Sequence, residues 1–416
     1  MASGPKILLG GIPLGCDNIG DEAIVACVSK MLKESVPGIS LTVATADPAT
    51  AGRLGVEVVP PFGFKGTPLD GFADVVRSHD AYVWCGATGL SDYPNVALDL
   101  LDSAQRAGVA TYVWGVGMDD ELNPVFFRAH GRRRLALKCL GLVGWYERRL
   151  RARLARRIAA VLPRCRGVWL RDPQSAAMLA SMGFPGAKVA ADTAILLGVA
   201  RGEATHDARI TNRESRISNH EPQTLGLCIS TQRQVADLGG LSKMISAVRG
   251  SGAKVLGIPM NPKTDRALLD RLGVECIAGD TPEAVCEAAA GCDVVLSSRL
   301  HLLILAANVG TPVLGIARGA KLANWLSNFG RTVEGSVYDC DWEMVTEHVR
   351  SALADRGDWD VVRDAAYRGL FERLEKARGE FAALLKGAAQ GGSAVHHSGD
   401  AQGGPSLHLA GDAQGE

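Results

Sequence analysis

Short apolar segments alternate with helix-like segments through most of this 416-residue chain, and no other feature constrains its fold as strongly. Each apolar segment is only a few residues long and is separated from the next by a stretch with helical spacing. Buried strands connected by helices are typical of a parallel β-sheet that is covered on both faces. In the first half of the chain we expect such strands at residues 7–9, 41–46, 81–85, 110–115, 167–171 and 188–191.

The alternation stops in a polar stretch, residues 201–222, and then resumes. A stretch with so few large apolar side chains indicates a linker or a long loop. We therefore predict an α/β chain of two parallel-sheet domains, residues 1–200 and 223–340, with a ligand cleft between them at the carboxyl ends of the strands. In the second domain the strands are expected at residues 224–230, 254–259, 275–278, 293–297 and 312–316.

The chain ends in two different kinds of sequence. Residues 341–386 have a helical period and are rich in Ala, Leu, Arg and Glu, so we expect C-terminal helices there. Residues 387–416 consist mainly of Gly, Ala, Gln, Ser and His and repeat the pentapeptide Gly-Asp-Ala-Gln-Gly. Such a composition cannot bury enough apolar surface to fold, which predicts a disordered tail.

Composition argues against several classes of function. Lys+Arg and Asp+Glu are equal at 45 each, so nucleic acid is not an expected partner. Ten cysteines without a C-x-x-C pair indicate a reducing compartment and no metal site. The N-terminus lacks the profile of a signal peptide, and no apolar stretch reaches the ~20 residues that a membrane span needs. We expect a cytoplasmic protein.

Residues 131–166 form a strongly basic segment in which arginines are interleaved with Leu, Ala and a Trp. Two interpretations remain open. The segment is either a solvated pair of helices, or a basic amphipathic surface that rests on an anionic membrane or a lipid-linked substrate at the inner membrane face. Its basic residues include Arg132, Arg133, Arg134, Lys138, Arg148, Arg149, Arg151, Arg153, Arg156 and Arg157.

A glycine-rich loop follows the first expected strand, but it differs from phosphate-binding loops. The G-x-G-x-x-G spacing and the Lys-Ser/Thr of a P-loop are both absent. Asp21 and Glu22 stand instead at the start of the next helix, where they favour the helix dipole and would repel phosphate. Together with Asn18 they are candidates for binding saccharide hydroxyls; the alternative is that both acids only cap the helix. Gly15, in the same loop, is expected to line the cleft.

Two further glycine-containing turns each follow an expected strand. Gly86, Gly89 and Gly117 would let the backbone approach a ligand closely, so we predict that they line the same cleft. Arg171 ends a later strand at a position that faces the cleft, and its alternative role is structural pairing with a carboxylate. Asp172, which precedes a proline, is expected to cap the following helix.

The most specific motif lies where a buried strand ends and a helix begins near Leu300. Arg299 and His301 therefore stand at a helix N-terminus on the cleft side of the sheet. The backbone N–H groups and the helix dipole favour an anion there, and the planar guanidinium group matches a carboxylate or phosphate. His301 is a candidate catalytic residue, and Lys321, after the next strand, could add a second positive contact.

These motifs resemble those of the polysaccharide pyruvyltransferase family in order and spacing over residues 5–330. The Asn-x-Gly-Asp-Glu-Ala of the family is matched by residues 18–23, and its Arg-Asp-x-x-Ser by residues 171–175. Its Arg-Leu-His and its Gly-x-Pro-Val are matched by residues 299–301 and 310–313. The chain departs from the family in a shortened glycine run after the third strand and in a Gly-x-Gly-x-x-Pro turn that lacks its proline.

The resemblance implies two Rossmann-like domains in a GT-B-like arrangement, with the acceptor on the first domain and the donor on the second. It implies transfer of the enolpyruvyl group of phosphoenolpyruvate to a saccharide or lipid-linked saccharide acceptor, which forms a pyruvate ketal in polysaccharide or cell-surface glycan biosynthesis. No cofactor or metal is needed, because phosphoenolpyruvate is the donor substrate. Arg171, Arg299 and Lys321 would bind this donor, and His301 would protonate its methylene carbon.

Two other functions are compatible with the same architecture. A GT-B nucleotide-sugar glycosyltransferase would carry a Glu-x7-Glu pattern, but the equivalent positions here are Ser297 and Leu305, and a leucine cannot accept a hydrogen bond from a ribose. A non-catalytic binding member of the family is the second alternative. The presence of Arg171, Arg299 and His301 together argues against it, because a scaffold has no use for all three.

Overall fold

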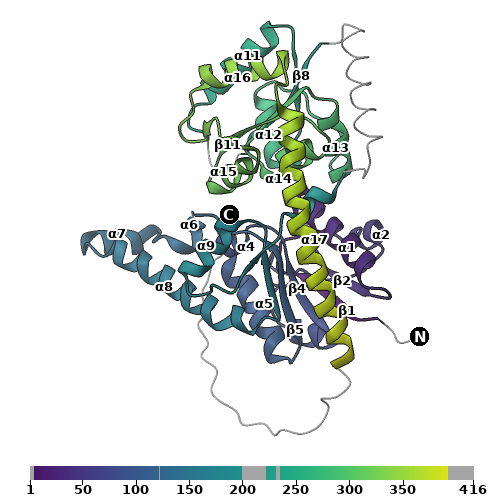
Figure 1. Cartoon of the computed structure of the whole chain (residues 1–416). Helices are drawn as coiled ribbons and strands as arrows, with labels where there is room; N and C mark the ends of the chain where they lie inside the picture. The colour runs from purple at the N-terminus through teal and green to yellow at the C-terminus, as the bar shows by residue number, and fades with distance from the viewer. Residues whose placement is uncertain (1–3, 121, 199–221, 231–234, 392–416) are drawn as a thin grey trace.

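The chain folds into two lobes, each built on a parallel β-sheet (Figure 1). The computed structural model describes residues 4–120, 122–198, 222–230 and 235–391. The predicted linker lies outside the described residues except for residue 222, and so does the predicted tail beyond residue 391.

Among the described residues, the first lobe has a seven-stranded parallel sheet with the order β3-β2-β1-β4-β5-β6-β7. The parallel sheet predicted from the apolar runs is thus confirmed, with the short strand β3 added at one edge. The strands are β1 Lys6–Gly10, β2 Ser40–Ala44, β3 Glu57–Val59, β4 Ala81–Cys85, β5 Ala110–Val116, β6 Gly167–Leu170 and β7 Lys188–Val189. The helices are α1 Ile19–Ser35, α2 Thr50–Leu54, α3 Phe72–Arg77, α4 Gly89–Asp92, α5 Pro94–Arg106, α6 Pro124–Phe127, α7 Gly131–Cys139, α8 Val143–Val161 and α9 Pro173–Ser181.

Within the described ranges, the second lobe has a five-stranded sheet with the order β12-β11-β10-β8-β9. The run expected as a strand at residues 275–278 makes only an isolated parallel bridge, from Cys276 to Gly257 at the end of β9. The strands are β8 Thr224–Cys228, β9 Lys254–Gly257, β10 Val294–Ser297, β11 Val313–Ala317 and β12 Gly335–Ser336. The helices are α11 Leu238–Gly250, α12 Thr264–Arg271, α13 Pro282–Ala290, α14 Leu300–Asn308, α15 Ala320–Leu326, α16 Trp342–Ala354 and α17 Trp359–Gly391.

The strand order reverses once in each sheet, between β1 and β4 in the first lobe and between β8 and β10 in the second. Loops diverge at such a point and leave a crevice outside the carboxyl ends of the strands. Loops from these edges of both sheets line one cleft between the lobes.

The helix α17 runs from the second lobe back along the first (Figure 1). Its Phe381 is fully buried and stacks on Trp114, with ring centroids 4.9 Å apart, and it also contacts Tyr112 and Trp169. The helices α16 and α17 lie where C-terminal helices were predicted, and α17 continues to Gly391, past residue 387 at which the tail was predicted to begin. The composition rich in Gly, Ala and Gln thus begins at residue 387, before the helix ends.

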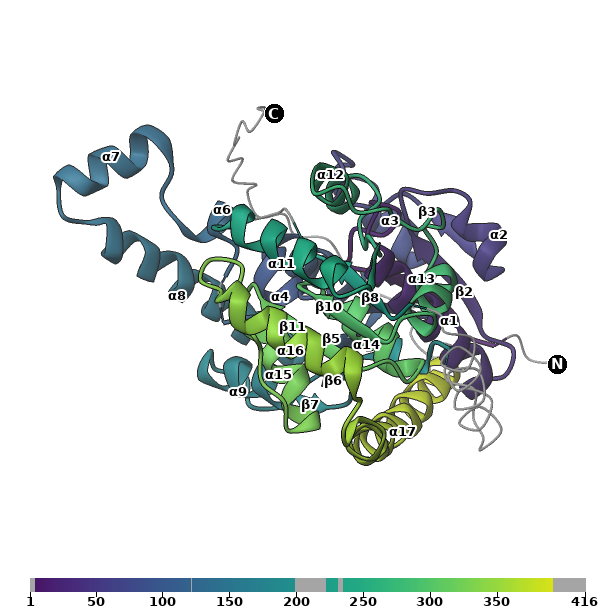
Figure 2. The ribbon, with the colours of Figure 1, turned by 90° about the horizontal axis from the view of Figure 1, so that it is seen from above.

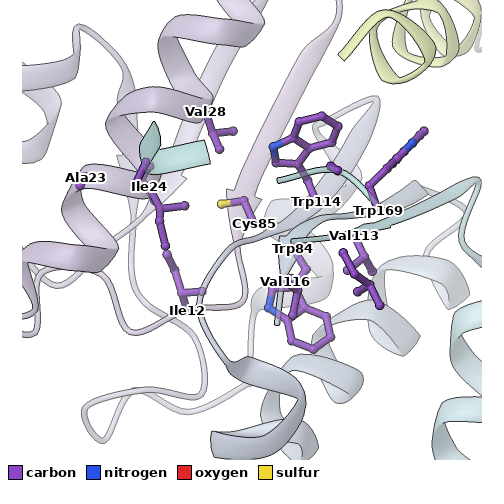
Figure 3. Packing of buried hydrophobic residues seen from close by; sticks show 14 of the residues in the cluster. Ile12, Ala23, Ile24, Val28, Trp84, Cys85, Val113, Trp114, Val116 and Trp169 are labelled. Carbon is purple, nitrogen blue, oxygen red and sulfur yellow. The ribbon is translucent and has the colours of Figure 1, made fainter. Parts of the chain in front are cut away.

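The two faces of the first sheet carry different aromatic residues. The register pairs Cys85 with Trp114 and Trp84 with Val113, and these two pairs point to opposite faces (Figure 3). The indole Nε1 of Trp114 donates to Thr193 Oγ1 at 3.0 Å. This bond joins the sheet to the short 3-10 turn η2, Thr193–Leu196, which follows β7.

Asn308, at the end of α14, fixes the position of one lobe on the other. Its Nδ2 donates to the carbonyl oxygens of Ala194 and Leu197 at 2.8 and 2.7 Å. Its Oδ1 accepts from Tyr367 Oη of α17 at 2.6 Å. One buried amide therefore connects the first lobe, the second lobe and the C-terminal helix.

We expect the Phe381→Ala variant to lower the free energy of unfolding by about 3–5 kcal/mol, because it removes a buried ring from the contact between α17 and the sheet. Urea unfolding followed by far-ultraviolet circular dichroism would measure the change. Leu384→Ala is the matched control in the same helix, since Leu384 is 39% exposed. Equal losses in both variants would contradict the packing described for α17.

Candidate active site

A cleft of about 570 Å³ lies between the lobes at the carboxyl ends of both sheets. Loops that follow β1, β4, β5 and β6 form one wall, and loops that follow β9, β10 and β11 form the other. The polar and charged residues that line it are Asn18, Asp21, Thr88, Asp92, Asn123, Arg171, Asn261, Ser298, Arg299, His301, Arg318 and Lys321.

The first turn of α1 places two of the predicted acceptor residues in the cleft and turns the third away. Asn18 is the N-cap: its Oδ1 accepts from the Gly20 amide at 3.2 Å, and its Nδ2 donates to Asp21 Oδ2 at 2.7 Å. Glu22 faces a neighbouring groove, where it accepts from the Gly15 amide and pairs with Arg53. The helix is thus capped by Asn18, and Asp21 is left as the carboxylate that faces the cleft.

Burial sets the protonation of Asp21. The side chain is only 2% exposed, and burial raises its pKa to about 6, against the opposing effects of His301 and the Asn18 hydrogen bond. A carboxyl group with this pKa can both accept and release a proton near neutral pH.

Arg171 lies at the end of β6 and is almost fully buried. Its Nε lies 3.2 Å from Asp172 Oδ2, its Nη1 lies 3.7 Å from Asp192 Oδ2, and its Nη2 is buried without a hydrogen-bond partner. Asp172 also accepts from the Ser175 amide at 2.7 Å and so caps α9, as predicted. The arginine is therefore held from one side by carboxylates, while an unpartnered nitrogen remains for a ligand.

His301 lies in the first turn of α14 and reaches across to the first lobe. Its Nε2 lies 3.4 Å from Asp192 Oδ2, and its ring lies directly against Gly20 of α1. A Cβ on residue 20 would come within 2.2 Å of His301 Nδ1. The glycine thus makes room for the imidazole, which is 14% exposed at the cleft.

Asp192 joins these two groups and was not among the residues predicted from the sequence. Its Oδ1 accepts from the Ala194 amide at 3.0 Å, while Oδ2 faces both Arg171 and His301. Burial alone would raise the pKa of Asp192, but the charges of His301 and Arg171 lower it below its ordinary value. Asp192 follows the short strand β7. Arg171 was predicted because it stands at the end of a parallel strand, and the same reasoning could have identified Asp192.

Arg299 has a different environment from the one expected of a residue that binds only the donor. Its Nε and Nη2 both bind Asp265 of α12, at 2.9 and 2.7 Å, and Asp265 is completely buried. This bidentate pair neutralises most of the charge that Arg299 would offer to an anion. Arg299 lines the cleft, but its main contact is within the second lobe.

Lys321 and Arg318, after β11, bring further positive charge to the cleft. Burial, together with the charge of Arg318, lowers the pKa of Lys321 to about 8. Arg318, which the sequence analysis did not select, donates from Nη1 to Ser230 Oγ at 2.8 Å. Asp119 of the first lobe accepts from the Ala320 amide at 2.8 Å, and burial raises its pKa to about 6.

The four predicted cleft glycines occupy different places. Gly89 lines the cleft itself, and Gly117 lies against the guanidinium group of Arg171. Gly86 has a φ of +77° and packs on Ile24 of α1, so its role is to let the turn pass under that helix. Gly15 lies on the neighbouring groove that Glu22 faces.

Two Rossmann-like lobes that face each other across a charged cleft define the GT-B class of enzyme fold. The family is given by a second observation. A model of the polysaccharide pyruvyl transferase family matches residues 18–319, and the chain belongs to this family.

Solved structures support the fold assignment. Alr3699/HepE from Anabaena, in complex with UDP and glucose, is 13% identical with a TM-score of 0.55, and the match covers 92% of this chain and 99% of that one. A UDP-GlcNAc 2-epimerase from Neisseria meningitidis has 12% identity, a TM-score of 0.51 and coverages of 92% and 99%. MnaA of S. aureus, with UDP, has 10% identity, a TM-score of 0.53 and coverages of 87% and 91%. No curated protein sequence matches the chain.

Among the described residues, no three His, Cys, Asp or Glu side chains are grouped as a metal ion would require. None of the described helices combines the length and apolarity needed to cross a bilayer.

We expect the Asp21→Asn variant to be more stable than the wild type at pH 8, by about 3 kcal/mol. Because the folded-state pKa of Asp21 is raised to about 6 from an ordinary 3.8, its stabilising contribution is complete below pH 3.8 and is lost as the pH rises through 6. Asparagine has no such ionisation and keeps an acceptor for Asn18. Urea unfolding at pH 4 and pH 8 would measure the difference.

Asp270→Asn is the control, since Asp270 is an exposed residue of α12. It should leave the pH dependence unchanged. A wild-type-like pH dependence in Asp21→Asn would show that Asp21 is not the destabilised carboxyl group.

Proposed function

We propose that the protein transfers the enolpyruvyl unit of phosphoenolpyruvate to a pair of saccharide hydroxyls and forms a pyruvate ketal. Membership of the pyruvyl transferase family supports the reaction class. The observation that carries the proposal is the buried contact chain Arg171–Asp192–His301, which brings a cation and a titratable imidazole to the same end of the cleft.

The donor has two anionic groups, a carboxylate and a phosphate, and the cleft offers positive charge for both. Arg171 presents the buried, unpartnered Nη2, and Arg318 and Lys321 stand on the opposite wall. Burial chiefly, and then repulsion by Arg318 and Arg171, lowers the pKa of Lys321. A dianionic ligand would relieve this repulsion, which favours such a donor over a neutral one.

His301 is the proposed acid. Protonation of the donor methylene carbon makes a methyl group and leaves an electron-deficient C2, to which the first saccharide hydroxyl adds. Asp192, whose pKa is held below its ordinary value, would orient the ring, in the way that a buried carboxylate orients a catalytic histidine.

Asp21 is the proposed acceptor of hydroxyl protons, since its pKa of about 6 makes it largely ionised at neutral pH. After the first addition, the C2–phosphate bond breaks, inorganic phosphate leaves, and the second hydroxyl adds to the same carbon. The two hydroxyls release two protons: one replaces the proton given to the methyl group, and the other leaves with the products. The balance needs no oxidant, reductant or further cofactor.

Transfer from a nucleotide sugar is the less favoured function. The position at which a glutamate would hold the ribose is Leu305, which is fully buried in α14. UDP in the similar structures belongs to those proteins, whose identities to this chain are 13% or less.

We expect His301→Gln to lower kcat for phosphate release from phosphoenolpyruvate by about 10²–10⁴-fold, with the fold intact. The assay supplies phosphoenolpyruvate and a panel of saccharide acceptors, and includes UDP-sugars as alternative donors. His348→Gln is the control, because His348 lies on the surface of the second lobe. Arg299→Ala is a poorer test, since it would leave Asp265 buried without its partner.

An unchanged kcat in His301→Gln would contradict the proposed role of His301 as the acid. Turnover of a UDP-sugar without phosphoenolpyruvate would replace the proposed reaction with glycosyl transfer.

We expect KM for phosphoenolpyruvate to rise about tenfold between pH 7 and pH 9, because Lys321, with its pKa lowered to about 8, loses its charge over this range. Lys321→Arg should remove this rise, since arginine stays charged. The effect should be in KM rather than kcat, because a bound anion keeps the lysine protonated. Lys254→Arg, at an exposed position, is the control, and a pH profile that is the same in both variants would contradict the assignment.

A further inference from the structure

The helices α7 and α8 and the turn between them, residues 131–161, project away from both lobes (Figures 1 and 2). We call this segment the basic hairpin. No residue of α7 is buried, and α8 buries only Leu154, Ile158 and Val161, in the half that lies nearest the body. A helix that packs so little on its own domain is not explained by the stability of the fold.

The charge of the basic hairpin is almost entirely of one sign. Residues 131–157 contain ten Arg and Lys side chains and one acid, Glu147, in a chain whose formal net charge is zero. Near the body the charge is paired, as in the contact of Arg157 with Asp99 of α5. Toward the tip, Arg133 lies over the ring of Tyr146 and Arg149 over the ring of Trp145.

Apolar side chains are exposed at the tip of the same hairpin. Leu135, Leu140, Leu142 and Trp145 are 65%, 68%, 40% and 48% exposed, and they surround the turn from α7 to α8. The other six tryptophans of the chain are all buried. Exposed leucines and a tryptophan beside many arginines are typical of surfaces that enter the interface of a bilayer.

We infer that the basic hairpin docks on an anionic lipid bilayer. The arginines would contact lipid phosphates, and the four apolar side chains at the tip would enter the region between the headgroups and the acyl chains. Charge complementarity favours this occupant, because ten cations with one acid match a surface of uniform negative charge. A protein partner would need an acidic groove that also accepts the apolar tip.

The position of the hairpin relates the bilayer to the cleft. It follows directly after α6, whose Pro124 and Val125 line the cleft. Docking would therefore place the cleft close to the bilayer surface, within reach of a saccharide carried on a lipid. This consequence for the acceptor rests on the proposed function, whereas the binding itself does not.

Sedimentation with vesicles tests the inference on the full chain. Wild-type protein should bind vesicles of phosphatidylcholine with phosphatidylglycerol, and bind much less to phosphatidylcholine alone or at high salt. The triple variant Arg132→Gln, Arg133→Gln, Arg134→Gln should lower the binding constant by at least about tenfold. The matched control carries three exposed changes on the second lobe: Lys243→Gln, Lys254→Gln and Arg271→Gln.

Tryptophan fluorescence gives a second readout. Trp145 is the exposed tryptophan, so vesicle binding should shift its emission to shorter wavelength, and the shift should be absent in Trp145→Phe. No binding to anionic vesicles at low salt, or equal loss in the triple variant and its control, would overturn the inference. Self-association that is lost in the triple variant, without vesicle binding, would identify the hairpin as a protein interface instead.

Vesicle binding can be measured without turnover, so the membrane-docking inference and the proposed reaction can be tested independently. A protein that binds vesicles but releases no phosphate from phosphoenolpyruvate keeps the hairpin assignment and loses the proposed reaction. The reverse result loses only the hairpin assignment.

Discussion

The buried carboxylate of Asp192 is the contact on which the arrangement of the site depends. A carboxylate that is 4% exposed stays ionised only when neighbouring groups compensate its charge, and here one such group comes from each lobe: the Arg171 guanidinium from the first and the His301 imidazole from the second. The contact between Asp192 and His301 therefore requires the lobes to be close at this point. Asn308 holds the same region from the apolar side of α14. Charge pairing and packing thus fix one geometry of the cleft.

The sequence predicted the parts of the structure that depend on local pattern, and missed those that depend on distant contacts. Apolar runs predicted both parallel sheets. The positions of Arg171 and His301 just after strands predicted that both face the cleft. Asp265 was missed because it lies on a helix, 34 residues from its partner Arg299. Asp192 follows the short strand β7, and its position at a strand end was the one local signal that could have identified it. Asp21 faces the cleft and Glu22 faces the neighbouring groove, because consecutive helical residues point about 100° apart. The sequence alone does not state which of the two faces the cleft.

The cleft holds charge that the fold alone would not favour. Asp21 has a pKa raised to about 6, and Lys321 has one lowered to about 8, in each case chiefly because of burial. Asp119, which binds the Ala320 amide beside the cleft, also has a pKa raised to about 6 by burial. An acid with a raised pKa and a lysine with a lowered pKa both destabilise the folded state when they are charged. The same shifts bring their pKa values closer to neutral pH, where they are useful in proton transfer and anion binding. The cleft also contains ion pairs that favour the charged forms, Arg171–Asp192 and Arg299–Asp265, and the shifts at Asp21 and Lys321 run in the opposite direction.

The distribution of charge over the whole molecule gives the hairpin a role beyond its own contacts. Because the chain is neutral overall and the hairpin is strongly positive, the remainder carries the compensating negative charge. An anionic surface would therefore attract the projecting hairpin and repel the body. A protein with this charge separation approaches such a surface in one preferred orientation, with α7 and α8 leading. The apolar tip adds short-range attraction only after the charges have oriented the molecule, so the two features act in sequence.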